Sequence, residues 1–188
     1  MSIIPKWIPL HVHSEYSAYD GAIRVADYLK YAEENELSAA AVSDHFTMSS
    51  YPDFDKTFSA SGIKPIYGNE LYSGTLFADG ISRVQLSGKK RFHLNSFALN
   101  SKGLINLQRL AASGVKNTEE STKGPYNITR QGLEDFHEGV VFSSACIAGE
   151  LPMLRGAGKE DDAKVWLSQV QGRGGKENFV GHKRPRFL

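Results

Sequence analysis

The chain has 188 residues, 40% of them hydrophobic and 23% charged, which is ordinary for a globular domain with a substantial core. No apolar run approaches the roughly 20 residues of a membrane span. The N-terminus has too little positive charge and too short an apolar stretch for a secretory signal. A single cysteine excludes an internal disulfide framework and fits a reducing compartment such as the cytoplasm.

The net charge of +1 is unevenly distributed along the chain. Residues 171–188 contain five basic side chains against Glu177 and carry +4, which leaves −3 for the first 170 residues. A protein that grips DNA mainly through its phosphates needs clustered lysine and arginine. The acidic body therefore indicates that any contact with nucleic acid is local.

A histidine pair follows the first apolar run. Residues 7–10 are expected to form a short buried strand, with His11 and His13 at its end. Because side chains two apart in a strand point the same way, both imidazoles can reach one metal ion. Asp20 lies beside Gly21, which permits a tight turn that returns the carboxylate to the pair. Two nitrogens and one oxygen suit a divalent cation, whereas a pair of hydrogen-bonded histidines without metal is the ordinary alternative.

Strand and helix patterns then alternate and place further polar side chains at strand ends. The expected elements are a helix over 23–35, a strand over 38–42, a helix over 52–60 and a strand over 63–67. In parallel α/β barrels and sheets, functional sites gather at the carboxyl ends of the strands. His45 and Glu70 follow two of these strands and therefore join the candidate ligands, although a solvated loop acid is the alternative for Glu70.

The second half of the chain continues this arrangement less regularly. After a loop or hairpin over 73–90 we expect a strand over 92–99, a helix from Ser101 to Gly114 capped by Ser101, an exposed loop over 115–127, a helix over 130–137 capped by Thr129, a strand over 140–142, helices over 147–154 and 159–170, and a strand from 178. His93 and Cys146 stand at strand ends and are candidate ligands. A free cysteine is usually a small hydrophobic residue, but this position favours a thiolate ligand.

The opening motif is specific enough to identify a resemblance. The pattern H-x-H-S-E-Y-S-x-x-D-G-A over residues 11–22 resembles the first motif of the PHP (polymerase and histidinol phosphatase) domain, in the form that begins the alpha subunits of bacterial DNA polymerase III, the C-family replicative polymerases. Further matching segments are residues 43–45, 62–70, 93–107 and 144–150. The resemblance extends from about Ile8 to Phe179.

The resemblance implies an α/β fold, a distorted (β/α)7-type PHP barrel, with up to about three metal ions of zinc, manganese or iron at the strand ends. The ligands that it implies are the residues already marked as candidates: His11, His13, Asp20, His45, Glu70, His93 and Cys146.

The chain departs from the family pattern near its C-terminus. The family completes its site with an Asp-x-His pair just after the position of Phe179, where residues 180–182 read Val-Gly-His. We therefore expect residues 1–179 to be a C-terminally truncated or frame-shifted PHP domain and 180–188 to be a basic tail outside the family pattern. Reading the encoding DNA beyond the Phe179 codon would test this expectation.

The resemblance also implies a function, metal-dependent phosphoester hydrolysis, with 3′–5′ exonuclease activity as one form. No side chain is assigned as the nucleophile, because a metal-bound water would take that role. Asp44 or Glu15 could orient a ligand imidazole or only cap local backbone. Phe46, where the family usually has glycine, is expected to narrow the mouth of the site. The catalytic carboxylates of the polymerase lie outside this chain, which cannot polymerise DNA by itself.

Two other functions remain open. A non-catalytic scaffold of the replicative polymerase is favoured by the missing Asp-x-His pair. Two observations argue against a free-standing small-molecule phosphatase: the sequence Ser-Glu-Tyr-Ser at residues 14–17, and the lack of an obvious arginine pocket for a small substrate. The expected partners are a DNA 3′ end or another phosphoester substrate, together with the other domains and subunits of the polymerase. We expect the protein to be cytoplasmic and to have no membrane partner.

Overall fold

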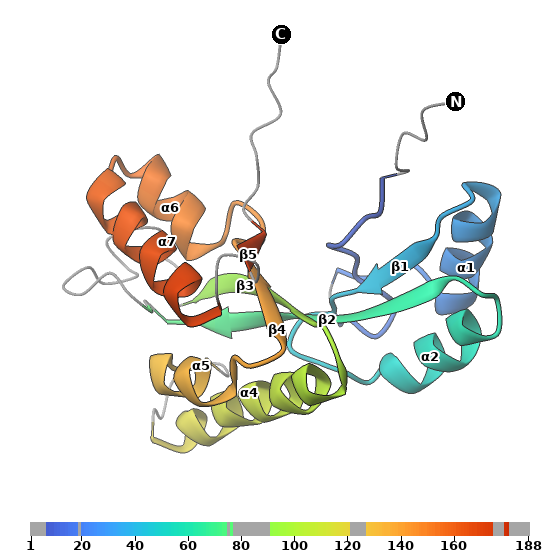
Figure 1. The fold of residues 1–188 in the computed structure, drawn as a ribbon, viewed down its shortest axis with the longest axis horizontal. Helices are drawn as coiled ribbons and strands as arrows, with labels where there is room; N and C mark the ends of the chain where they lie inside the picture. The colour runs from blue at the N-terminus through green and yellow to red at the C-terminus, as the bar shows by residue number, and fades with distance from the viewer. Residues whose placement is uncertain are drawn as a thin grey trace, which may run out of the picture. The chain divides into compact units, whose positions relative to one another are not determined.

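The computed structural model describes residues 7–18, 20–74, 76, 91–120, 127–174 and 179–180. The chain divides into two compact units, residues 1–69 and residues 70–188, called here the first and the second unit. Figure 1 shows helices and strands in both. The predicted mixed α/β class is therefore confirmed.

The first unit is built from two helices and two strands. They are α1 (Val25–Glu34), β1 (Ala39–Val42), α2 (Tyr51–Ser59) and the first part of β2 (Lys64–Ser73), which continues into the second unit. β1 pairs in parallel with β2, with Ala39 opposite Lys64 and Val42 opposite Tyr67. All four residues of β1 are buried, as expected for a small-residue parallel strand.

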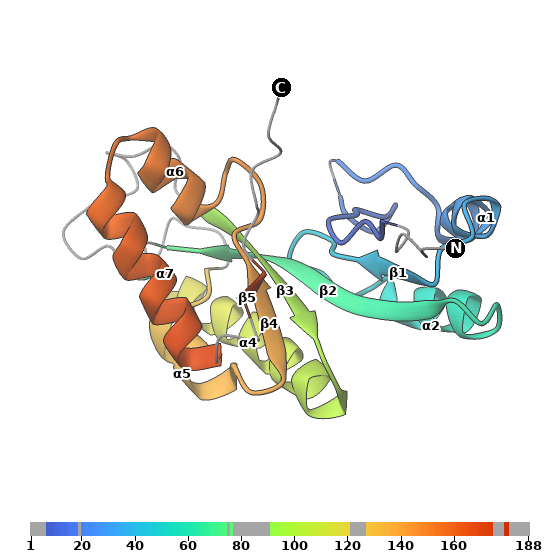
Figure 2. The ribbon, with the colours of Figure 1, turned by 45° about the horizontal axis from the view of Figure 1, so that its top comes forward.

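An aromatic core holds α1 and α2 together. The Tyr28 ring lies 6.4 Å from the Phe54 ring and 5.4 Å from the Phe58 ring, measured between centroids. Phe54 and Phe58 are four residues apart and therefore share one face of α2, as their spacing predicts. All three residues are buried, and Figures 1 and 2 show the two helices side by side.

The second unit contains the remaining strands and four further helices. They are β3 (Phe92–Ala98), α4 (Ser101–Glu120), α5 (Arg130–Phe136), β4 (Val140–Ser143), α6 (Glu150–Gly156), α7 (Glu160–Gly174) and β5 (Phe179–Val180). Thr129 caps α5 as predicted, with its side chain accepting from the Gly132 N–H at 3.0 Å. α6 and α7 lie side by side in Figures 1 and 2, and none of the described helices is long and apolar enough to cross a membrane.

The second unit departs from a purely parallel arrangement of strands. β3 and β4 pair antiparallel, with Asn95 opposite Ser143, whereas β4 and β5 pair in parallel. The start of α4 comes very close to the turn before β4, because a Cβ placed on Gly103 would lie 1.8 Å from the Gly139 carbonyl oxygen. Only a residue without a side chain fits at Gly103.

The predicted opening strand is wrong. Residues 7–10 form no strand, and the Trp7 side chain is 73% exposed. In the described part of the chain, backbone pairing begins after this segment. The Val12 carbonyl accepts from the Ser43 N–H at 2.8 Å, and Ser14 forms an isolated β-bridge with Ile23. The apolar character of residues 7–10 was not sufficient, because a strand also needs a neighbouring strand to pair with.

The predicted ends of α4 are also wrong. Asn100 caps the helix instead of Ser101, because its Oδ1 accepts from the Gly103 N–H at 2.9 Å. The helix also continues past Gly114 into the segment predicted as a loop. A glycine inside a helix costs only about 1 kcal/mol, and the burial of Leu107 and Leu110 on the same helix outweighs it. The loop expected over 73–90 lies mostly outside the described residues.

A buried acid organises α6 and α7. Glu150 is only 2% exposed, and its carboxylate accepts from the Leu76 N–H at 2.9 Å and from the Trp166 indole N–H at 3.0 Å. These donors satisfy a carboxylate that would otherwise be costly to bury. Trp166 is itself 1% exposed, so the hydrogen bond connects two helices inside the core.

Candidate functional site

Four of the predicted ligands meet in the first unit and are called here the aspartate-centred cluster: His11, His13, Asp20 and His45. Asp20 is the shared partner, because its Oδ2 lies 2.8 Å from the Nδ1 of His13 and 2.8 Å from the Nε2 of His45. The Nε2 atoms of His11 and His13 lie 3.1 Å apart. The sequence prediction that Gly21 turns the Asp20 carboxylate back towards the histidine pair is consistent with this geometry.

The donor set of this cluster fits a divalent cation. His13, Asp20 and His45 each offer one ligand atom, and these three atoms all lie within 4.8 Å of one another. Imidazole nitrogens with a carboxylate oxygen suit zinc, manganese or iron. Burial acts to raise the pKa of Asp20, but hydrogen bonds from Ser17 and His13 outweigh it and lower the pKa, so the carboxylate is ionised at neutral pH.

Serine side chains hold the aspartate-centred cluster in place. The Ser17 hydroxyl donates to the Oδ1 of Asp20 at 2.9 Å and accepts from the His45 backbone N–H at 3.1 Å. The Ser43 hydroxyl accepts from the Val12 N–H at 3.0 Å, between the two histidines of the opening motif. Ser17 and Ser43 are buried. The sequence reasoning missed these roles, although the serines stand between and beside the ligands in the two motifs.

Asp44 contacts Ser14. It is 1% exposed, and its carboxylate accepts from the Ser14 backbone N–H at 2.6 Å and from the Ser14 hydroxyl at 2.9 Å. These bonds cap local backbone and connect the opening motif to the end of β1. Glu15, the other residue expected to orient an imidazole, is exposed, and its backbone N–H donates to the Ile23 carbonyl.

Two residues beside candidate ligands have strained backbone. Phe46, which follows His45, has φ 50°, and Ala145, which precedes Cys146, has φ 55°. These values lie in the left-handed region, which costs a residue with a side chain about 1–2 kcal/mol. The conformation gives a physical reason for glycine at the position of Phe46, and strain of this kind commonly occurs at functional sites.

The other three predicted ligands meet in the second unit and are called here the glutamate-centred cluster: Glu70, His93 and Cys146. The Nδ1 of His93 lies 2.7 Å from the Oε1 of Glu70 and 3.5 Å from the Sγ of Cys146. The Glu70 side chain is 1% exposed, whereas the His93 side chain is 22% exposed. A carboxylate from within β2, an imidazole near the start of β3 and a sulfur shortly after β4 therefore converge. The prediction that Glu70 follows its strand is wrong, because β2 continues to Ser73.

Ionisation in the glutamate-centred cluster is strongly coupled. Burial acts to lower the pKa of His93, but hydrogen bonds to Cys146 and Glu70 outweigh it and raise the pKa to about 9. The hydrogen bond to His93 in turn lowers the pKa of the Cys146 thiol. Because a cation binds the deprotonated imidazole and thiolate, metal binding at these residues would compete with protons.

Replacing Gly21 with alanine is expected to destabilise the first unit by about 1–3 kcal/mol and to weaken metal binding. A Cβ at this position would lie 1.8 Å from the Ser14 carbonyl oxygen and would push the turn that carries Asp20 away from the histidines. Urea denaturation and metal titration measure the two effects. Gly156→Ala is the control, because nothing lies within 4 Å of its added Cβ. Equal stability and metal affinity of the two variants would contradict the expectation.

Comparisons with known proteins show which family the chain matches. Residues 9–180 match the PHP domain. The chain is similar to DNA polymerase III subunit alpha from Borreliella burgdorferi (34% identity, 92% of this chain), Deinococcus radiodurans (33%, 89%) and Aquifex aeolicus (30%, 88%). It spans only 15%, 13% and 14% of the length of these relatives. The match leaves eight residues on each side within the sequence, too few to hold a polymerase domain.

Solved structures give weaker likenesses. A candidate metal-dependent phosphoesterase from Bifidobacterium adolescentis has a TM-score of 0.38 and 17% identity, over 95% of this chain and 59% of that chain. An amidohydrolase from Chromobacterium violaceum has a TM-score of 0.38 and 16% identity, over 85% and 53%. At these scores neither likeness bears on the assignment. It is the match over residues 9–180 that decides it, and the chain belongs to the PHP domain family.

Proposed function

We propose that this PHP domain is a metal-dependent phosphoesterase that acts on a DNA 3′ end as a 3′–5′ exonuclease. The observation that supports it most is the Asp20 carboxylate, whose Oδ2 lies 2.8 Å from both the His13 and the His45 rings. Three ligands of this kind around one point suit zinc, manganese or iron. The proposed metal ligands are the seven residues of the two clusters.

A divalent cation bound by such ligands makes water a nucleophile at neutral pH and neutralises charge on the phosphate oxygens. Hydrogen bonds from other residues of the protein hold the proposed ligands in place. Ser17 donates to Asp20 and keeps one carboxylate oxygen turned away from the histidines. The buried Glu70 carboxylate has the His93 Nδ1 as a partner at 2.7 Å, which compensates for its removal from water.

The proposed setting is a replicative polymerase. The relatives in the comparisons are DNA polymerase III alpha subunits, so the proposed partners are the other domains and subunits of such a polymerase and the DNA 3′ end. Because these relatives are bacterial DNA polymerase subunits, the proposed compartment is the cytoplasm.

The second candidate function is a non-catalytic scaffold within the polymerase. One observation favours it: residues 180–182 read Val-Gly-His, where the family pattern has an Asp-x-His pair. A site with fewer ligands would bind metal more weakly. A free-standing phosphatase acting on small monophosphates is a third candidate and is separated from the others by its substrate.

The test is hydrolysis by the purified chain after loading with Mn²⁺ or Zn²⁺. The substrates are a 5′-labelled single-stranded oligonucleotide and a small phosphate monoester. Stepwise shortening of the labelled strand from its 3′ end, abolished by His11→Ala, is the expected result. His137→Ala is the matched control, because His137 hydrogen-bonds the Glu134 carbonyl on α5 and belongs to neither cluster.

Other outcomes separate the alternatives. Hydrolysis of the monoester without attack on DNA would support the phosphatase. An inactive protein that binds less than one metal ion per chain would support the scaffold. Activity that survives in His11→Ala would show that the cluster is not the reacting site.

A further inference from the structure

An arginine is held beside the glutamate-centred cluster by an aromatic ring. The Arg91 guanidinium lies over the Tyr72 ring, with 4.1 Å between its central carbon and the ring centroid. The Tyr72 ring in turn contacts the His93 ring at a centroid distance of 5.4 Å. All three residues are only partly exposed. The positive charge of Arg91 is therefore fixed two contacts away from His93, which itself contacts Glu70 and Cys146.

The strand register explains why these side chains gather. Glu70 and Tyr72 are two apart on β2, and Arg91 and His93 are two apart where the chain enters β3. Residues two apart along an extended chain project to the same side, at a spacing of about 7 Å. The face that presents the ligands Glu70 and His93 thus also presents Tyr72 and Arg91.

Arg91 differs from three other described arginines in what holds it. Arg24, Arg130 and Arg155 each pair with a carboxylate. Arg91 instead contacts the Tyr72 ring, and no acid among the residues that the structure describes neutralises it. Stacking uses the face of a guanidinium and leaves the N–H groups on its edge available to an anion.

We propose that Arg91 is a substrate-binding residue that contacts a phosphate next to the scissile one, so that the site takes a phosphodiester chain in preference to a monophosphate. A guanidinium edge matches two phosphate oxygens with two parallel hydrogen bonds. Tyr72 keeps the guanidinium in place before substrate arrives, which reduces the entropy that binding would cost. This inference rests on the proposed phosphoesterase function and specifies its substrate class.

The test measures binding as well as turnover. The probes are a short labelled oligothymidylate with phosphorothioate linkages, which resist hydrolysis, and inorganic phosphate, each titrated against the Mn²⁺-loaded full chain. Arg91→Ala is expected to weaken oligonucleotide binding by about 10- to 100-fold, because a hydrogen-bonded charge is lost. It should also lower the slope of log Kd against log salt by about 0.7, the value for one phosphate contact on a single strand. Binding of inorganic phosphate should change by less than about 3-fold, because one phosphate group occupies only the metal ligands.

Further variants separate positioning from general charge. Arg91→Lys keeps the charge and should recover the salt slope while recovering affinity only in part. Tyr72→Leu removes the ring and should weaken oligonucleotide binding while Arg91 remains. Arg109→Ala, an exposed arginine on α4, removes the same charge elsewhere in the second unit and should bind like wild type. Metal content is measured for every variant, so that a collapsed cluster is recognised.

The outcomes distinguish this inference from the proposed function. If wild type hydrolyses DNA and Arg91→Ala keeps its affinity, salt slope and KM, the role of Arg91 is overturned while the phosphoesterase stands. An equal loss of inorganic phosphate binding would also overturn it. If wild type hydrolyses nothing but binds the oligonucleotide in a manner that depends on Arg91, the phosphate contact stands and the proposed activity fails.

Discussion

Replacing Asp20 with asparagine is expected to weaken divalent metal binding at the aspartate-centred cluster by at least about 100-fold, since loss of an outer hydrogen-bond partner alone costs about 10- to 100-fold. The amide has nearly the same shape as the carboxylate but carries no charge. It cannot accept from His13 and His45 as a carboxylate does, and it is a poor ligand for a cation. Titration of the metal-free protein with Zn²⁺ or Mn²⁺ measures the change, and the phosphoesterase activity should fall with it.

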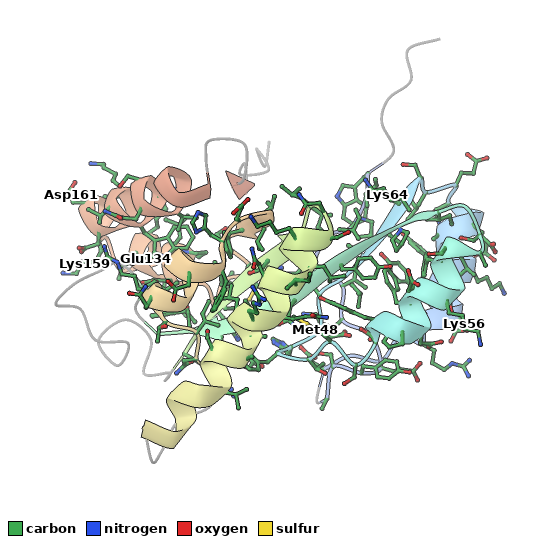
Figure 3. The ribbon with its side chains drawn as sticks, turned by 60° about the horizontal axis from the view of Figure 1, so that its bottom comes forward. Met48, Lys56, Lys64, Glu134, Lys159 and Asp161 are labelled. Carbon is green, nitrogen blue, oxygen red and sulfur yellow. The ribbon has the colours of Figure 1, made fainter. Side chains whose placement is uncertain are left out.

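The control for this experiment is Asp161→Asn. Figure 3 shows Asp161 at the start of α7, and its side chain is 96% exposed and pairs with Lys164. This variant removes the same charge from the chain and should bind metal like wild type. A wild-type affinity in Asp20→Asn would remove Asp20 from the ligand set.

In the presence of a chelator, the free energy of unfolding of the second unit is expected to decrease as pH rises from about 6.5 to 9. The pKa of His93 is raised to about 9 in the folded protein, against 6.5 when unfolded. A raised pKa contributes stability that is complete below 6.5 and is lost as pH passes through 9. The His93 contribution is about 3 kcal/mol in size, and little screening applies because its side chain is mostly covered.

Two comparisons sharpen this prediction. The lowered pKa of Cys146 acts with the opposite sign, since it adds stability as the thiol ionises, so the measured loss is a net value. His93→Gln removes the titrating ring and should flatten the pH dependence. Added Zn²⁺ should reverse it, because a cation binds the deprotonated imidazole and thiolate and binds more tightly at higher pH. The same slope in His93→Gln and wild type would contradict the prediction.

The membership of each cluster could be predicted because the information is local. His11, His13 and Asp20 lie within ten residues, and a turn at Gly21 is enough to bring them together. His45 and Cys146 follow strands and His93 lies near the start of one, and strand ends are where side chains of α/β domains converge. Glu70 instead lies inside β2, because that strand continues to Ser73 beyond the predicted end at residue 67. The ligand-rich ends of the elements were therefore visible before any contact was known.

Contacts between segments far apart in sequence could not be predicted in this way. The pairing of Arg91 with Tyr72 joins two segments that are far apart in sequence, and neither residue carries a periodic signal. The serines of the first unit have the same limitation, because a hydroxyl satisfies a turn, a cap or a neighbouring carboxylate equally well. The antiparallel pairing of β3 with β4 is accompanied by the close approach of Gly103 to Gly139, and no strand pattern in the sequence shows in which direction a neighbouring strand runs.

The placement of the two tryptophans gives the molecule a built-in optical reporter. Trp166 is enclosed in the second unit against Glu150, whereas Trp7 belongs to the first unit and is largely in contact with solvent. Buried and exposed indoles emit at different wavelengths and differ in their access to a dissolved quencher. The variant Trp7→Phe would leave Trp166 as the single tryptophan. The fluorescence of the intact chain would then report the unfolding of the second unit without an added label.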